Sequence, residues 1–139
     1  IIENILKPFE SIAKKNGIEY VEFINGGEGD KSLYKKSFNP EFPNLTSDVL
    51  EKNAEFTAGD RNTPLHLELT SKYKHNIICH VFPMKRTGNI TDTFIVETQL
   101  PLNESAGDIA ACMAGIIANF MSHFEEEQSS NEKSEKYRR

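Results

Sequence analysis

The sequence predicts an α+β domain built around a central antiparallel sheet of about five to six strands. Apolar residues recur at helical spacing near both ends of the chain, whereas short alternating or wholly apolar segments fill its middle. Short stretches rich in Gly, Asn and Asp join several of these segments, which favours hairpins between consecutive strands. Elements in this order predict an antiparallel sheet with helices on its faces.

The first helix is predicted to run from Ile2 to the Asn16-Gly17 pair. One face of that helix collects apolar side chains at helical spacing, namely Ile2, Ile5, Leu6, Phe9, Ile12 and Ala13. Gly17 can adopt the positive φ that often ends a helix. Pro8 removes one helical hydrogen bond, so the helix either bends there or begins near Lys7 with Pro8 in its first turn.

A hairpin is predicted next, from strands at residues 18–25 and 32–38. The first strand (IEYVEFIN) alternates, with Val21 and Phe23 on one face and Glu22 on the other. The segment GGEGD between the strands lacks the GK[ST] sequence of a phosphate-binding loop, and its two acidic residues oppose an anion. We therefore interpret it as a hairpin turn rather than an anion site.

Residues 39–64 are predicted to be mainly loop, because Pro and Gly punctuate them. Within this stretch, residues 46–52 (TSDVLEK) favour a short helix and residues 54–58 (AEFTA) a short strand.

Three more strands are predicted at residues 65–70, 77–84 and 91–98. The first alternates, with leucines on one face and polar residues on the other. The second (IICHVFPM) is apolar on both faces, as expected of a central strand, with Pro83 near its end. A turn at residues 86–89 (RTGN) leads into the third strand (TDTFIVET).

The last helix carries the strongest periodic pattern in the chain. Asn103 or Ser105 is expected to cap it, since Ser105 and Asp108 resemble a capping box. Its apolar stripe consists of Ile109, Met113, Ile116, Phe120 and Phe124, broadened by Cys112, Ile117 and Met121. A stripe of this width can pack on a sheet and still meet a second helix, which predicts a homodimer through the terminal helices.

The C-terminal segment differs from the rest of the chain. Residues 125–139 hold one aromatic residue, no aliphatic ones and many charges, so they predict a helix that continues into a linker, or a frayed tail. We expect a folded domain at residues 1–127 and a charged linker or tail at residues 128–139. Because the chain begins with Ile1, we also expect it to be a piece of a longer protein.

Composition excludes several classes of function. The 139 residues include 16 Lys and Arg against 21 Asp and Glu, and this net charge of -5 argues against nucleic acid and against docking on anionic membranes. Two cysteines exclude a disulfide-rich scaffold. No apolar run is expected to reach the roughly 18 residues that span a bilayer, which predicts a soluble segment.

The second half of the chain resembles a GAF domain. The likeness lies in IICHVFPM, the turn after it, TDTFIVET, and the closing LPLNESAGDIAACMAGIIANFMSHFEEE. It implies that the first and last helices pack on one face of the sheet, that a loop and short helix cover the other, and that the helices pair with a second copy. PAS and roadblock folds use similar elements and stay open as alternatives.

The resemblance also implies a cytoplasmic, non-enzymatic sensor domain of a bacterial signalling protein. The helix ending NFMSHFEEEQ is similar to the one that leads from GAF domains into GGDEF cyclase domains, so the output expected is turnover of cyclic-di-GMP. No cofactor is implied beyond an unidentified small ligand. Under a roof at about residues 38–64, the implied pocket is lined by Phe56, His66, Glu68, Ile78, His80, Phe82 and Phe94.

The residues allow three other interpretations: a metal site, a redox switch and an interaction module. His66 and His80 are predicted to face each other across a hairpin, but the spacing lacks a metal-binding HxH or CxxC pattern. Cys79 and Cys112 lie in apolar patterns typical of buried thiols, with a redox switch as the alternative, and no catalytic arrangement stands out. The remaining interpretation is a protein-interaction module that binds no ligand, because its own side chains fill the pocket. The candidates for filling it are Phe38, Phe42, Phe56 and Phe82.

Overall fold

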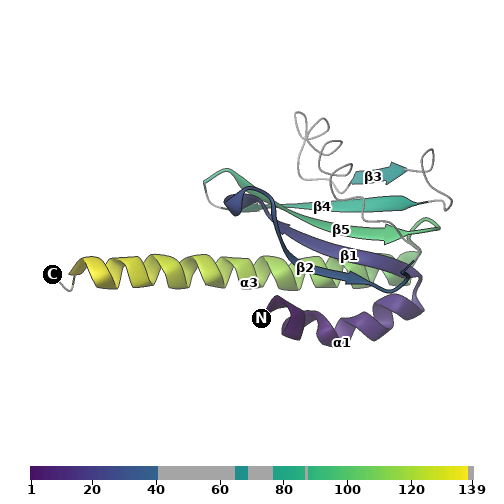
Figure 1. Cartoon of the computed structure of the whole chain (residues 1–139), viewed down its shortest axis with the longest axis horizontal. Helices are drawn as coiled ribbons and strands as arrows, with labels where there is room; N and C mark the ends of the chain where they lie inside the picture. The colour runs from purple at the N-terminus through teal and green to yellow at the C-terminus, as the bar shows by residue number, and fades with distance from the viewer. Residues whose placement is uncertain (41–64, 69–76, 87, 138–139) are drawn as a thin grey trace.

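A computed structural model describes residues 1–40, 65–68, 77–86 and 88–137, without the side chains of residues 28, 65–68 and 124–137. The described elements form an antiparallel sheet and two long helices (Figure 1). In chain order they are α1 (Ile2–Lys15), β1 (Ile18–Asn25), the 3₁₀ turn η1 (Gly26–Glu28), β2 (Lys31–Ser37), β3 (Leu65–Glu68), β4 (Ile78–Arg86), β5 (Ile90–Thr98) and α3 (Glu104–Tyr137).

The sheet has the strand order β2-β1-β5-β4-β3, and all neighbouring strands are antiparallel. The predicted α+β class with an antiparallel sheet is therefore confirmed, with five strands in the described residues. Strand β5 is central and pairs with β1, although some 70 positions separate the two in the sequence. The predicted short helix at residues 46–52 and short strand at residues 54–58 lie outside the described residues.

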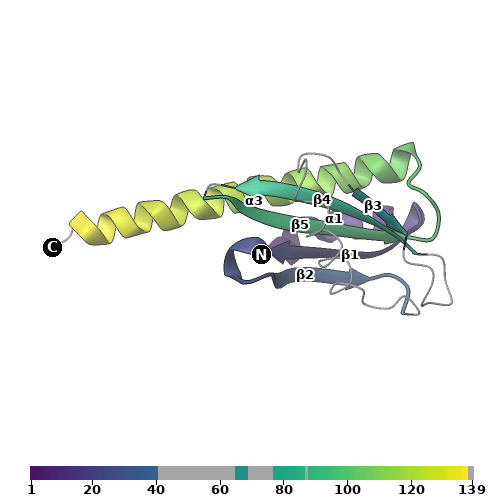
Figure 2. The same ribbon diagram turned by 90° about the horizontal axis from the view of Figure 1, so that it is seen from above.

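Helices α1 and α3 lie side by side on one face of the sheet, as two perpendicular views show (Figures 1 and 2). The periodic apolar residues of each helix point into a common core with one face of β1 and β5. This core contains Ile2, Leu6 and Ala13 of α1, Ala110, Met113, Ile117 and Met121 of α3, and Val21, Phe23, Phe94 and Val96 of the sheet. We call α1 and α3 together the helical layer.

Helix α1 begins at Ile2 and contains Pro8 in its interior, so the alternative of a start near Lys7 is wrong. Pro8 is exposed, which leaves water free to satisfy the carbonyl that the ring cannot bond. The predicted stop is confirmed, since Gly17 has a φ of 84°. The helix is also tied to β2, because the Tyr34 hydroxyl donates a 3.0 Å hydrogen bond to Glu10. Burial and then this bond raise the pKa of Tyr34 well above its usual value.

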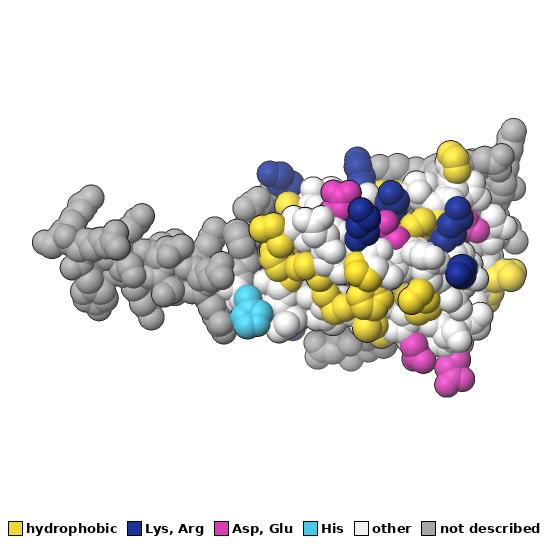
Figure 3. Space-filling view, turned by 90° about the horizontal axis from the view of Figure 1, so that it is seen from below, with side chains coloured by type: hydrophobic (Ala, Val, Ile, Leu, Met, Phe, Trp, Pro, Cys, Tyr) yellow, Lys and Arg dark blue, Asp and Glu magenta, His cyan; other side chains and the backbone are white. Residues whose placement is uncertain are grey.

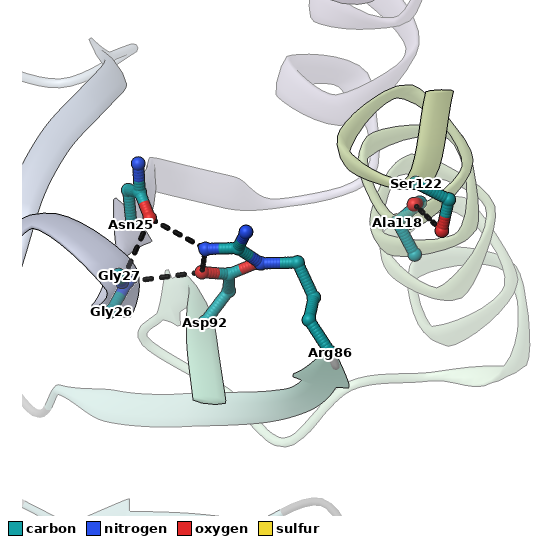
Figure 4. A network of polar contacts seen from close by, with 7 residues as sticks. All are labelled: Asn25, Gly26, Gly27, Arg86, Asp92, Ala118 and Ser122. Atoms are coloured by element: carbon teal, nitrogen blue, oxygen red, sulfur yellow. Dashed lines mark hydrogen bonds and ion pairs between the residues drawn. The ribbon is translucent and has the colours of Figure 1, made fainter. Parts of the chain in front are cut away.

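The GGEGD segment forms a turn, as predicted, and its backbone amides are bonded within the protein (Figure 4). The Gly26 amide donates to Asp92 Oδ1 at 2.9 Å, and the Gly27 amide donates to Asn25 Oδ1 at 2.9 Å. Arg86 binds Asp92 through Nε at 2.6 Å and donates from a second nitrogen to Asn25 Oδ1 at 2.7 Å. This network fixes the turn after β1 to the β4–β5 hairpin and occupies amides that an anion would need.

Helix α3 is longer than predicted and extends well past the sheet (Figure 1). Its 34 residues span about 51 Å at 1.5 Å per residue and run through the predicted tail as far as Tyr137. Asn103 caps it by accepting a 2.8 Å hydrogen bond from the Ala106 amide. Contrary to the sequence-based expectation, Glu104–His123 is apolar and long enough to cross a membrane by length and composition, a test that core helices of soluble proteins also pass.

Candidate functional site

The two faces of the sheet follow from its register. Residues directly opposite each other share a face, and successive residues of a strand alternate between faces. On β5, Phe94 and Val96 belong to the core against the helical layer. Thr93, Ile95 and Glu97 therefore point to the opposite face, which we call the open face because neither α1 nor α3 lies on it, although these side chains are buried.

Four polar side chains meet on the open face, and we call them the Glu97 cluster: Tyr20, Glu22, Cys79 and Glu97. Glu97 is flanked in register by Cys79 on β4 and Tyr20 on β1. All four are buried, with exposed fractions of 5% or less. The cluster thus takes its members from the three central strands of the sheet.

In the described part of the chain, the Glu97 carboxyl group at the centre of the cluster accepts a hydrogen bond at one of its two oxygens. The Tyr20 hydroxyl donates a short hydrogen bond to Glu22 Oε1, and Cys79 Sγ lies 3.8 Å from Glu97 Oε1 and donates to it. Glu97 Oε2 is buried and has no hydrogen-bond partner among the described residues. A buried polar atom left in this state costs about 1–3 kcal/mol relative to a bonded one.

The pKa of Glu97 is raised to about 8, chiefly by burial, while the hydrogen bond from Cys79 lowers it and the charge of Glu22 raises it. Glu97 therefore holds its proton over much of the neutral range. A protonated carboxyl group can donate one hydrogen bond and accept others, whereas the ionised group can only accept. The site can consequently take up either a hydrogen-bonding group or a cation that displaces the proton.

Four of the predicted pocket residues lie on β4 and β5, namely Ile78, His80, Phe82 and Phe94, and the structure places them on the face of the helical layer. The prediction that these four residues line a pocket on the face away from the helices is therefore wrong. Phe94 is fully buried, and its ring centre lies 6.1 Å from that of Phe82. The reason is the two-residue period of a strand, which sends their neighbours Cys79, Val81 and Glu97 to the open face instead.

His80 is almost fully buried, with 2% of its surface exposed. Its Nε2 lies 2.9 Å from the Thr98 hydroxyl, which donates its proton to the Leu100 carbonyl at 2.6 Å. Because a hydroxyl has one proton, Nε2 is the donor to Thr98. This chain of bonds fixes the connection between β5, which carries Glu97, and α3.

The predicted pairing of two histidines is confirmed at the backbone, because His66 lies opposite His80 in the register. Glu68 lies opposite Ile78, and Phe56 is outside the described residues. In the described part of the chain, no three His, Cys, Asp or Glu side chains gather as metal ligands do. Both cysteines are free, and the expectation of burial is correct for Cys79 but wrong for Cys112, which is exposed on α3.

The predicted dimer stripe of α3 divides between two environments. Met113 is fully buried in the core and thus unavailable to a second copy, whereas Ile109, Ile116 and Phe120 are half-buried at the margin of the core. The side chain of Phe124 lies outside the description. Ile1, directly before α1, and Ile12 on α1 are 83% and 47% exposed. Hydrophobic side chains accordingly form a band on the outer surface of the helical layer (Figure 3).

A separate cavity of about 350 Å³ lies at the end of the sheet where α1 meets β1 and β5 leads into α3. It is lined by the amides of Asn16, Gln99 and Asn103, by Glu19, and by the apolar segment 100–102. It shares no residue with the Glu97 cluster or with the predicted pocket.

Sequence reasoning missed the Glu97 cluster. The available signal was one glutamate directly beside large apolar residues in each of two strands: Glu22 between Val21 and Phe23 in IEYVEFIN, and Glu97 after Val96 in TDTFIVET. Comparison of the chain with models of known protein families, and with curated proteins, gives no match.

Proposed function

We propose that this chain is a GAF-like regulatory domain that binds a small ligand on the open face of its sheet. The observation that carries the proposal is the buried Glu97 carboxyl group, whose Oε2 has no hydrogen-bond partner in the described part of the chain. Buried polar groups are nearly always bonded, and unbonded ones concentrate at sites with a role. The resemblance to GAF domains implies helices on one face of the sheet and a ligand pocket on the other. The helical layer and the Glu97 carboxyl group, which lie on opposite faces, are consistent with that arrangement.

The connection from β5 to α3 gives the proposed domain a route for its signal. Glu97 is followed directly by Thr98, whose hydroxyl is bonded to both His80 and Leu100, and Asn103 then caps α3. A ligand that prefers one position of β5 would bias the position of α3 by its difference in affinity for the two states. We further propose a cytoplasmic bacterial protein with an attached output domain, of which cyclic-di-GMP turnover is the expected activity.

Native mass spectrometry of protein purified from cells tests ligand binding. We expect a co-purifying small molecule on the wild-type chain and its loss from Glu97→Gln. Asp30→Asn is the matched control, because it removes one exposed carboxylate in a turn whose positive φ asparagine tolerates. Equal retention of the molecule by all three proteins would contradict a site at Glu97.

Dimerisation through the helical layer is the second part of the proposal. Ile12 is 47% exposed on α1, and Leu33 is 38% exposed on β2, away from this layer. We expect size-exclusion chromatography with light scattering to give a dimer for the wild type and for Leu33→Asp, and a monomer for Ile12→Asp. A monomeric wild type at high concentration would count against the helix pair.

The alternative function is an interaction module without a ligand, and the hydrophobic band of the helical layer favours it (Figure 3). In this case the chain dimerises or binds a partner protein through α1 and α3 alone. A wild-type dimer that carries no small molecule, and whose dimerisation Glu97→Gln leaves unchanged, would support this alternative over the sensor.

A further inference from the structure

We infer that the cavity between the end of α1 and the start of α3 is a second ligand site, which takes a small zwitterionic amino acid with an aliphatic side chain. This inference goes beyond the proposed function, because the cavity shares no residue with the Glu97 cluster. Its volume of about 350 Å³ is large enough for a small molecule. The kind of ligand follows from the hydrogen-bonding groups that line it.

The lining that comes from α1 and β1 offers hydrogen-bond acceptors. The Asn16 side-chain nitrogen donates a 2.8 Å hydrogen bond to the Ile12 carbonyl, which leaves Asn16 Oδ1 as an acceptor. Glu19 is the extra residue where the pairing of β1 with β5 shifts register. Within the described part of the chain, the Glu19 carboxylate has no hydrogen bond or ion pair. A carboxylate and an amide oxygen together suit an ammonium group.

The lining that comes from the start of α3 offers hydrogen-bond donors. Asn103 Oδ1 accepts from the Ala106 amide at 2.8 Å, so the side-chain nitrogen of Asn103 keeps its two N–H donors. Such donors suit a carboxylate. Among the described residues that line the cavity there is no Lys, Arg or His, so a simple anion would meet the charge of Glu19 without compensation. An amino acid avoids this cost, because its own ammonium group pairs with Glu19.

The segment that joins β5 to α3 gives the cavity an apolar part. Residues 100–102 (Leu-Pro-Leu) line it, and Leu100 is 76% exposed, which is unusual for a large hydrophobic side chain in this domain. An aliphatic ligand side chain that covers this segment removes apolar surface from water on both molecules. The cavity thus combines acceptors, donors and an apolar surface, which are the three parts that an aliphatic amino acid requires.

Heteronuclear NMR titration of the whole chain near neutral pH, where leucine is a zwitterion, tests this inference. The probes are L-leucine, its decarboxylated analogue 3-methylbutylamine and its deaminated analogue 4-methylpentanoate. We expect L-leucine to shift the amides of Gly17, Gln99 and Ala106 in a saturable manner. Both analogues should bind at least about tenfold more weakly, as the loss of one charged hydrogen-bonding group predicts.

Two substitutions test the two kinds of lining. Glu19→Gln removes the carboxylate, and Asn103→Asp keeps an oxygen to cap α3 but replaces the N–H donors with an acceptor. Each should weaken the binding of L-leucine at least about tenfold. The matched control is Glu3→Gln, which removes an exposed carboxylate from the first turn of α1, at the other end of that helix, and should bind as the wild type does.

The outcomes separate this inference from the proposed function. Glu97→Gln should bind L-leucine as the wild type does, whether or not it loses a co-purifying molecule. Equal binding of 3-methylbutylamine and L-leucine would overturn the zwitterionic class, and unchanged binding of L-leucine in Glu19→Gln or in Asn103→Asp would overturn the site. If L-leucine gives no saturable shift, the inference fails and the proposed ligand site at Glu97 is unaffected.

Discussion

Replacing Glu97 with glutamine should abolish a specific pH dependence of the free energy of unfolding. Glutamine has nearly the shape of the protonated acid but no proton to lose. In the wild type, the pKa of Glu97 is raised from 4.5 to about 8, chiefly by burial. Between these two values the folded protein keeps a proton that the unfolded chain has released, so stability falls as the pH rises. The stabilising effect of the proton is complete below 4.5 and is lost by the time the pH passes about 8.

The size of this effect follows from the width of the interval. Each pH unit corresponds to about 1.4 kcal/mol for one proton, so the span implies a loss of roughly 3–5 kcal/mol. Because Glu97 is only 1% exposed, solvent screening reduces this figure little.

Urea unfolding followed by circular dichroism at several pH values from about 5 to 9 measures the difference. Wild type and Glu97→Gln should be similar in stability at the acidic end, and the variant should be the more stable by several kcal/mol at the alkaline end. The exposed control Asp30→Asn should follow the wild type. Parallel curves for wild type and Glu97→Gln over the whole range would refute a buried carboxyl group with a raised pKa.

Three further predictions concern the fold. Gly26→Ala should destabilise the domain by about 1–3 kcal/mol or more in urea unfolding, because the added Cβ would overlap a backbone carbonyl of β5. Gly115→Ala, at an exposed position of α3 with no atom near the added Cβ, should instead stabilise the domain by up to about 1 kcal/mol. Met113→Ala should cost about 2–5 kcal/mol and Ile116→Ala clearly less, since the first side chain is fully buried and the second half-buried; equal losses would contradict this core. Arg86→Ala should cost about 3–5 kcal/mol, because it leaves a buried carboxylate unpaired, and a thermal midpoint like that of the wild type would show that the network contributes nothing.

Local pattern predicted most of the elements of the fold. The helical period of α1 and α3, the alternation of β1 and the Gly-rich turns each depend on residues close in sequence, and the structure places all of them where expected. Helix α3 continues beyond residue 127, where the sequence has many charged residues and no apolar stripe. The periodicity of apolar residues cannot predict where a helix ends in a segment that has no apolar residues at helical spacing.

The candidate site was missed because it depends on which strands are neighbours and which face the helices cover. Glu22 alternates with Val21 and Phe23 as a solvent-facing residue would, yet it is 2% exposed. Pairing β1 with β5 brings Glu22 and Glu97 into one buried region. The predicted pocket includes His80 and Phe94, which the two-residue period of a strand places on the face opposite to that of Cys79 and Glu97.

The most direct test of this account is the titration of the Glu97 side-chain carboxyl carbon by NMR. The proposed ligand site depends on a buried carboxyl group whose Oε2 has no hydrogen-bond partner among the described residues. We predict an apparent pKa of about 8 in the folded, ligand-free protein. A value near the ordinary 4.5 would show a solvated or fully bonded carboxylate and would contradict the account.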